Sequence, residues 1–320
     1  THFSPRLGFA WTPGAKTTVR GSAGVYYDAN VSGNWNYPPP GAPPIEVYYF
    51  NDETGEYDIF GWDSQYAYVV DPDLVAPRSL QYSLGIEQQL GKNIAIGAQL
   101  VYKDTEDLIG WENTGDGRYR EVPFTDPFTG QQYTLWNEIE PATRRKGNRP
   151  GVTANPDATE YYQDYAALIL TFKKRTADGW NLMGSYTLSR SQGLSPRMLS
   201  DWQFNPFYGS REGYDPNNYI NADQLLQGDR RHMLNLQGNV DLPWSMNLAA
   251  MLTLQSGRPY SRQIRVPLNQ GRVRVIMDPA EDGRRYDFQT LLDVSLGKRF
   301  VIKGEAAVKV DLQLLNALNE

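Results

Sequence analysis

Strict alternation of apolar and polar residues is the feature of this sequence that most constrains its fold. In the segment 80–90, apolar residues at positions 80, 82, 84 and 86 alternate with glutamine, serine, glycine and glutamate. A period of two residues is typical of a β-strand with one apolar face, because successive side chains of a strand point to opposite sides. Ten segments show this period: Leu7–Trp11, Thr17–Asp28, Leu80–Leu90, Ile94–Tyr102, Tyr165–Lys174, Trp180–Leu188, His232–Val240, Met246–Leu254, Leu292–Phe300 and Ala306–Leu314. The sequence therefore predicts an all-β fold of about ten strands.

The connections between these segments alternate between short and long. Four connections are long: Ala29–Ser79, Asp104–Asp164, Ser191–Gly228 and Gly257–Arg285. Loops beyond about 15 residues are uncommon in compact domains. Strands of about ten residues, with tight turns at one end and long loops at the other, are typical of outer-membrane barrels. The pattern thus predicts an antiparallel transmembrane β-barrel with short periplasmic turns and long extracellular loops.

Charge and composition agree with this prediction. The four long connections carry a net charge of −11, whereas the rest of the chain carries +5. The absence of cysteine excludes disulfides and thiolate metal sites, and the overall charge of −6 disfavours nucleic-acid binding. No apolar run reaches the roughly 18 residues that a membrane-spanning helix needs. Aromatic residues near the strand ends suit the girdles of a barrel: Trp11, Tyr26, Tyr27, Tyr102, Trp180, Trp244 and Phe300.

A soluble all-β protein is the alternative, since periodicity does not say on which side of the sheet the apolar stripe lies. The soluble alternative predicts that Leu84, Ile96, Leu252 and Val294 point into a closed, dry interior. The barrel predicts that they face outward, towards lipid.

Short motifs along the chain resemble TonB-dependent receptors, in particular their Oar-like branch. These motifs are Phe3–Pro13 with Thr18–Asp28, Tyr82–Leu90, Leu170–Trp180 with Gly184–Arg190, Asp229–His232, Ser256–Tyr260 and Leu314–Asn319. Such receptors close about 22 strands around a plug. The resemblance implies that residues 1–320 form one partial barrel domain, a fragment without signal peptide, plug, TonB box or last strand.

The resemblance also implies a function in the cell outer membrane. We expect a receptor for TonB-energised uptake of an unidentified substrate that binds to the extracellular loops. The implied partners are the TonB complex, the extracellular ligand, and outer-membrane lipid with lipopolysaccharide. We expect neither a cofactor nor enzymatic activity. The alternatives are a passive porin, a surface adhesion barrel, and a ten-stranded outer-membrane protease in which Asp229 orients His232 to activate water.

The long connections hold the candidate ligand-binding residues. Ala29–Ser79 has eight acids, one base and ten aromatic residues. Aromatic faces near carboxylates suit sugars or cationic groups, although the same aromatics also suit packing of the loops into a folded cap. The candidates are Trp35, Tyr48, Tyr49, Trp62, Tyr66, Trp111, Trp136 and Trp202.

Charged motifs in the later connections suggest further contacts. Gly257–Arg285 has seven arginines against three acids, which suits lipopolysaccharide phosphates or the acidic loops. Asp215–Asn218 hints at calcium but lacks the glycine and glutamate of a calcium loop. With only two histidines, His2 and His232, the chain is not expected to hold a metal.

Overall fold

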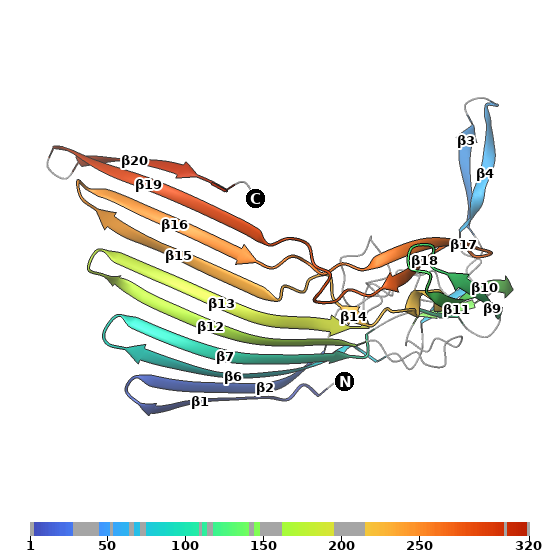
Figure 1. Ribbon diagram of the computed structural model, residues 1–320, viewed down its shortest axis with the longest axis horizontal. Coiled ribbons are helices and arrows are strands. Elements are labelled where there is room, and N and C mark those ends of the chain that lie inside the picture. The colour runs from blue at the N-terminus through green and yellow to red at the C-terminus, as the bar shows by residue number, and fades with distance from the viewer. Residues whose placement is uncertain are drawn as a thin grey trace.

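The computed structural model describes residues 3–27, 45–51, 54–63, 67–70, 75–108, 111–113, 118–140, 144–147, 162–194, 215–303 and 306–318. Its main element is an antiparallel sheet in the order β1-β2-β6-β7-β12-β13-β15-β16-β19-β20 (Figure 1). The strands are β1 (Arg6–Gly14), β2 (Thr17–Tyr27), β6 (Arg78–Leu90), β7 (Ile94–Glu106), β12 (Gln163–Ala177), β13 (Trp180–Gly193), β15 (His232–Leu242), β16 (Met246–Gln255), β19 (Gln289–Lys303) and β20 (Ala306–Leu314). The short strand β14 (Gln224–Leu225) pairs with β13. The sheet is not closed, and β1 and β20 form its two edges.

These ten strands confirm the all-β prediction, and each lies beside the predicted strand that follows it in the sequence. Several strands extend beyond their predicted ends into the long connections. For example, β7 continues past Tyr102, its predicted end, to Glu106. At the other end, tight turns join the strands. Asp178 and Gly179 both have positive φ, 57° and 77°, which matches the right-handed twist of a two-residue hairpin. We call the two ends of the sheet the turn end and the loop end.

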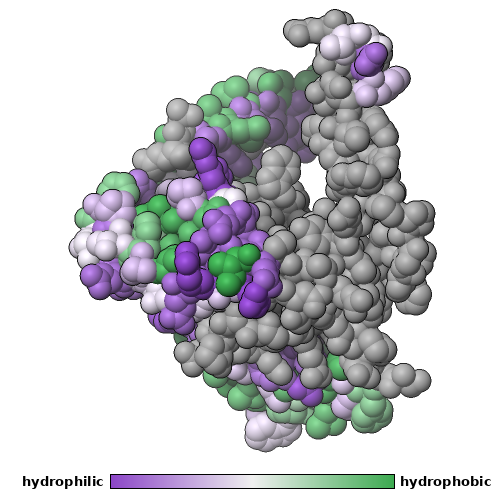
Figure 2. Space-filling view, turned by 90° about the vertical axis from the view of Figure 1, so that its right-hand side faces the viewer, coloured by the Kyte–Doolittle hydropathy of each residue, from purple (hydrophilic) through white to green (hydrophobic). Residues whose placement is uncertain are grey.

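The pairing register gives the sheet two chemically different faces. On one face, which we call the apolar face, Leu84, Leu100, Leu168 and Leu188 form a row across four strands. On the other, the polar face, Glu87, Gly97, Thr171, Ser185, Asn235 and Thr253 form a row across six. Figure 2 views the molecule from the loop end and shows hydrophobic residues along its top and bottom.

The apolar face is not enclosed, which contradicts the soluble alternative. Leu84 is 51% exposed and Ile96 is 41% exposed. Leu252 and Val294 are half-buried between neighbours on the same face. Both clusters of buried apolar side chains that the described residues form lie beyond the loop end rather than against this face.

Aromatic residues at the turn end match the predicted girdle. Trp11, Trp180, Trp244 and Phe300 are all exposed there. The Lys174 ammonium lies 3.9 Å from the centre of the Trp180 ring and donates to the carbonyls of Ala177 and Trp180, at 2.8 and 3.1 Å. The charge of Lys174 is therefore held at the turn end. At the loop end Tyr102 is exposed and Tyr26 and Tyr27 are half-buried.

The long connections hold further strands that the sequence analysis did not predict. Two hairpins are formed by β9 (Arg118–Thr125) with β10 (Gln132–Glu140), and by β17 (Arg262–Leu268) with β18 (Gly271–Asp278). In the first long connection β3 (Ile45–Asn51) pairs with β4 (Glu56–Asp63). A small sheet joins the first two long connections: β11 (Arg144–Gly147) and β8 (Trp111–Asn113) come from the second, and β5 (Ala67–Val70), on the other side of β11, comes from the first. A 3-10 turn, η4, spans Pro216–Tyr219. No helix in the described ranges is long and apolar enough to cross a membrane.

Candidate functional site

Three of the long connections fold into one body beyond the loop end, which we call the cap (Figure 1). One core joins the two hairpins and consists of Leu135, Val266, Val273, Val275 and Met277. A second core draws on segments far apart in the sequence and consists of Leu108, Leu194, Tyr219, Ala222 and Ile276. Because each core combines side chains from more than one connection, the cap is held by burial of apolar surface between them.

Side-chain amides complete the hydrogen bonding of β10. The Nδ2 of the buried Asn217 donates to the Trp136 carbonyl at 2.7 Å, and its Oδ1 accepts from the Trp136 amide at 2.8 Å. From the turn between β17 and β18, Gln270 Nε2 donates to the same carbonyl at 2.8 Å, and its Oε1 accepts from the Glu138 amide at 2.9 Å. These amides satisfy backbone groups that would otherwise be buried without partners.

Asp215 supports this arrangement from the start of η4. Its Oδ1 accepts from the amide and the side chain of Asn217 at 2.9 and 2.7 Å, and its Oδ2 accepts from Gln270 Nε2 at 3.2 Å. Burial raises the pKa of this carboxyl. The motif Asp215–Asn218 is thus occupied by contacts within the protein. In the ranges that the structure describes, no group of three or more acidic or histidine side chains is arranged to hold a metal ion.

A second buried carboxylate, Asp126, connects the two hairpins of the cap. It accepts from the Phe128 amide at 3.0 Å and from Thr129 Oγ1 at 2.7 Å, and it forms an ion pair with Arg262. Arg262 also pairs with Asp278 on β18. The hydrogen bond from the Arg262 guanidinium holds the pKa of Asp126 well below its usual range. Asp126 therefore stays ionised and ties the β9–β10 turn to β17.

Asp229 and His232 do not form the pair that the protease alternative needs. The buried Asp229 accepts from the Ser191 amide at 2.6 Å and forms an ion pair with Arg285. The His232 imidazole lies in the apolar-face row of Leu188, and its Nδ1 is 2.8 Å from the Tyr186 hydroxyl. Each group has a different partner, so the carboxylate does not orient the imidazole.

Of the eight aromatic candidates, only Trp136 has a described side chain. It is half-buried and lies opposite Glu121, on the side of the β9–β10 hairpin away from the core residue Leu135. The backbones of Tyr48 and Tyr49 lie in β3, that of Trp62 in β4 and that of Trp111 in β8. Their side chains, and the whole of Trp35, Tyr66 and Trp202, lie outside the described residues. For these seven residues, ligand binding stays a prediction, and the same holds for Trp136.

The residues that hold Trp136 in place, Asn217, Asp215 and Gln270, were not predicted from the sequence. An Asp-Pro pair such as Asp215-Pro216 is a signal for a helical start, since a capping carboxylate before proline suits the first turn. The contacts from Asn217 and Gln270 to β10 join positions 81 and 134 residues apart, and no local pattern specifies them.

Known proteins share both the sequence pattern and the fold. Residues 1–263 match the outer membrane beta barrel domain family. The TonB-dependent transporter Oar of Myxococcus xanthus is 24% identical over 269 residues, which cover 78% of this chain and 22% of that protein. The chain thus spans less than a quarter of this relative.

Two solved structures show the shared fold. The outer membrane transporter YddB from Escherichia coli matches 99% of this chain over 37% of its own, with a TM-score of 0.58 and 14% identity. The siderophore receptor PirA from Acinetobacter baumannii also matches 99% of this chain over 37% of its own, with a TM-score of 0.51 and 12% identity. These relatives are transporters and receptors, not enzymes. Because the family match covers more than half of its residues, the chain belongs to the outer membrane beta barrel domain family, and its place is the cell outer membrane.

Proposed function

We propose that this chain forms part of the wall and the extracellular cap of a receptor that imports a substrate with energy from the TonB complex. One observation carries the proposal: a ten-stranded sheet has one apolar and one polar face, and three of its long connections form a packed cap beyond the loop end. The apolar face suits contact with lipid, and the polar face suits a water-filled lumen. The similarity to the TonB-dependent transporter Oar supports the energy source.

In this proposal the cap and the first long connection bind the substrate. Trp136 contributes an aromatic side chain beside the Glu121 carboxylate, and Asn217 and Gln270 fix its backbone. An aromatic face near a carboxylate suits stacking on a sugar or contact with a cationic group. The polar row contains Asn235 and Thr253, whose side chains are hydrogen-bonded at 3.1 Å. In this proposal the row lines the path of the substrate through the lumen, between the cap and the turn end.

Growth experiments test the energy source. The gene that encodes this chain is deleted, and growth is measured on a panel of single nutrient sources beside a strain that lacks TonB. We expect both deletions to abolish growth on the same source. If only the first deletion does so, a passive porin explains the result and the proposal is wrong.

The role of the cap is tested on that same nutrient source. Trp136→Ala is expected to raise the concentration needed for half-maximal growth. Thr134→Ala, an exposed change on the same strand, serves as the control. Equal growth of both variants and the unaltered strain would remove Trp136 from the binding site.

A further inference from the structure

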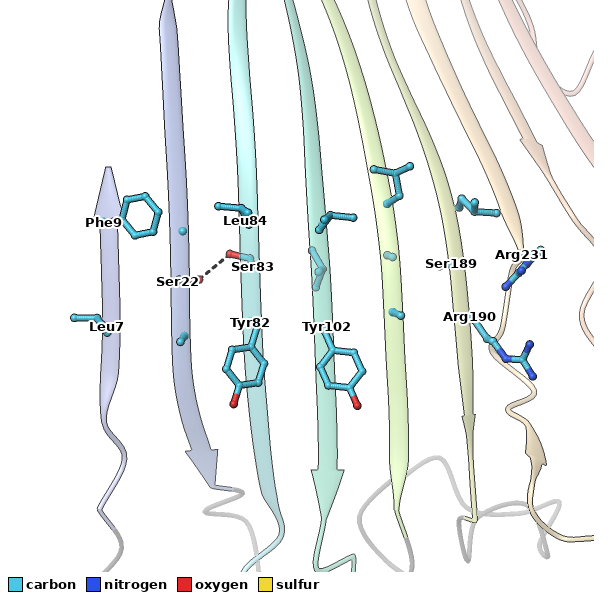
Figure 3. Close-up of a pocket in the computed structure, with 18 residues that line it drawn as sticks. Leu7, Phe9, Ser22, Tyr82, Ser83, Leu84, Tyr102, Ser189, Arg190 and Arg231 are labelled. Atoms are coloured by element: carbon cyan, nitrogen blue, oxygen red, sulfur yellow. Dashed lines mark hydrogen bonds between the residues drawn. The ribbon is translucent and has the colours of Figure 1, made fainter. Parts of the chain in front are cut away.

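A shallow groove crosses the apolar face of the sheet near the loop end (Figure 3). It has a volume of about 710 Å³. Its floor lies over the small residues Ala23 on β2 and Ala166 on β12, between larger side chains of the neighbouring strands, whereas the Phe9 ring covers Gly21. Leu84 and Leu100 are among these larger side chains and are exposed. The short side chains of Ala23 and Ala166 thus leave room for an apolar chain.

Two arginines lie at one end of this groove. Arg190 of β13 is in the row of Tyr82, Tyr102 and Ala166, and Arg231 immediately precedes β15 (Figure 3). Arginine side chains near the loop end can lay their methylene stems on the apolar face while the guanidinium stays at the polar boundary of the membrane.

The positive charge of this arginine pair is only partly compensated. Among the residues that the structure describes, Asp282 is the acidic group that faces both arginines: its Oδ2 is 3.7 Å from Arg190 Nη1, and its charge also interacts with Arg231. Asp282 is already paired with Arg285 at 2.6 Å, and that hydrogen bond lowers its pKa. Two guanidinium groups therefore share one carboxylate that a third already occupies, which leaves net positive charge beside the groove.

Nearby polar groups limit where an anion can bind. Tyr82 and Tyr102 are stacked, with ring centres 6.4 Å apart, and their hydroxyls point towards the loop end (Figure 3). The Tyr102 hydroxyl is 3.4 Å from the carboxylate of Asp164, which lies opposite Asp104 in the next row. These two acids disfavour an anion above the tyrosines, so the arginine side of the groove is the favoured position.

We propose that this groove binds lipopolysaccharide, with an acyl chain over Ala166 and Leu168 and a head-group phosphate on Arg190 and Arg231. The occupant follows from three observations. The face belongs to a barrel of the outer membrane, the groove is apolar along its length, and its cationic end at β13 and β15 includes Arg190, in the row of lining residues nearest the loop end. Guanidinium groups bind phosphate oxygens through paired, charge-assisted hydrogen bonds. The inference rests on the proposed placement of the loop end outside the cell, but not on TonB or on the substrate.

Binding to the purified, delipidated full-length protein tests the inference. Three probes are titrated separately by native mass spectrometry: bisphosphorylated lipid A, phosphatidylglycerol and inorganic phosphate. We expect lipid A to bind most tightly. Arg190→Gln combined with Arg231→Gln should weaken it by about a hundredfold, since one lost charge-assisted contact costs about tenfold. Arg175→Gln, an exposed arginine at the turn end, is the matched control and should change nothing.

A second variant separates binding from folding. Ala166→Leu fills the groove and keeps both arginines, so it should weaken lipid A binding at least severalfold. Equal binding of lipid A to the unaltered protein and the double arginine variant would overturn the inference. Equal affinity for phosphatidylglycerol would also overturn it, by showing a general anionic surface, as would tight binding of inorganic phosphate alone. None of these outcomes affects the growth experiments, because lipid binding is measured without TonB or substrate.

Discussion

Asn217 occupies with one side chain the position that a neighbouring strand would take beside β10. Its amide group both donates to and accepts from the Trp136 backbone, as a strand residue would. Asp215 holds this amide in place, and Gln270 reaches the same carbonyl from another connection. The orientation of Trp136, the one candidate whose side chain is described, therefore depends on residues in two other connections.

Asn217→Ala tests this dependence. Removal of the amide takes away the acceptor of the Trp136 N–H, whereas the Trp136 carbonyl keeps Gln270 as its donor; a donor left without its partner costs about 1–3 kcal/mol. Hydrogen exchange of peptides from 118–140, read by mass spectrometry, is expected to show a loss of protection of that size. The exposed change Thr134→Ala should leave exchange unaltered. Unchanged protection in Asn217→Ala would mean that water replaces the amide and that the contact is not what holds β10.

At the residue scale the sequence was a poor guide to partners. Asp229 and His232 are three positions apart, and their spacing suggested an interacting pair. In the structure Asp229 pairs with Arg285, 56 residues away, and His232 contacts Tyr186, 46 residues away. The Asp229–Arg285 pair depends on which connections pack together in the cap, and the His232–Tyr186 contact depends on the pairing of β13 with β15. The spacing of Asp229 and His232 encodes neither contact.

The elements of the sheet were largely predictable, because each strand has two faces that meet different surroundings. Alternation over many residues fixes both the strand and its register, since a shift by one residue would exchange the two faces. The cap hairpins were missed for a local reason. Ile264, Val266 and Leu268 alternate on β17, but the run is short and lies within a long connection. The turn before Gly271, whose φ is 109°, was the available signal.

Charge substitutions on adjacent residues of β7 test the assignment of the two faces. Leu100→Arg places a guanidinium on the apolar face, whereas Gln99→Arg places it on the polar face; both native side chains are exposed. We expect Leu100→Arg to lower the free energy of unfolding in lipid vesicles by about 2–4 kcal/mol near the bilayer centre, and Gln99→Arg to change it little. Equal losses in the two variants, measured by urea titration, would contradict the assignment.

The ion pair between Asp126 and Arg262 makes the packing of the two cap hairpins depend on pH in a defined direction. The pKa of Asp126 in the folded protein is lowered by the Arg262 hydrogen bond. Its stabilising contribution is therefore complete above the unfolded pKa, about 3.9, and is lost as the pH falls through the folded pKa.

Limited proteolysis of the cap tests this direction. Asp126→Asn is expected to be cleaved faster than the unaltered protein at pH 7 and at pH 5, with the same difference at both values. At lower pH, with an acid-stable protease, the cleavage rates of the two proteins should become more similar. A difference that already disappears between pH 7 and pH 5 would contradict the assigned direction of the pKa.

At the scale of the whole molecule, average composition conceals the architecture. The mean hydropathy of −0.57 describes a hydrophilic chain. The average arises because half of each strand carries polar side chains and the long connections are strongly charged. The order of strands along the sheet followed from the alternation of short and long connections, since tight turns join antiparallel neighbours.

Contact of the apolar face of the sheet with lipid, and of the polar face with water, is tested most directly along β7. The chain has no cysteine, so single cysteines along β7, at each position from 95 to 102, accept a spin label without interference from the rest of it. Collisions with oxygen, which dissolves in lipid, are compared with collisions with a water-soluble nickel chelate in reconstituted membranes. Labels at even positions such as Leu100 should favour oxygen, and labels at odd positions such as Gln99 should favour the chelate. Equal accessibility at even and odd positions, or a preference for the chelate at Leu100, would contradict the account.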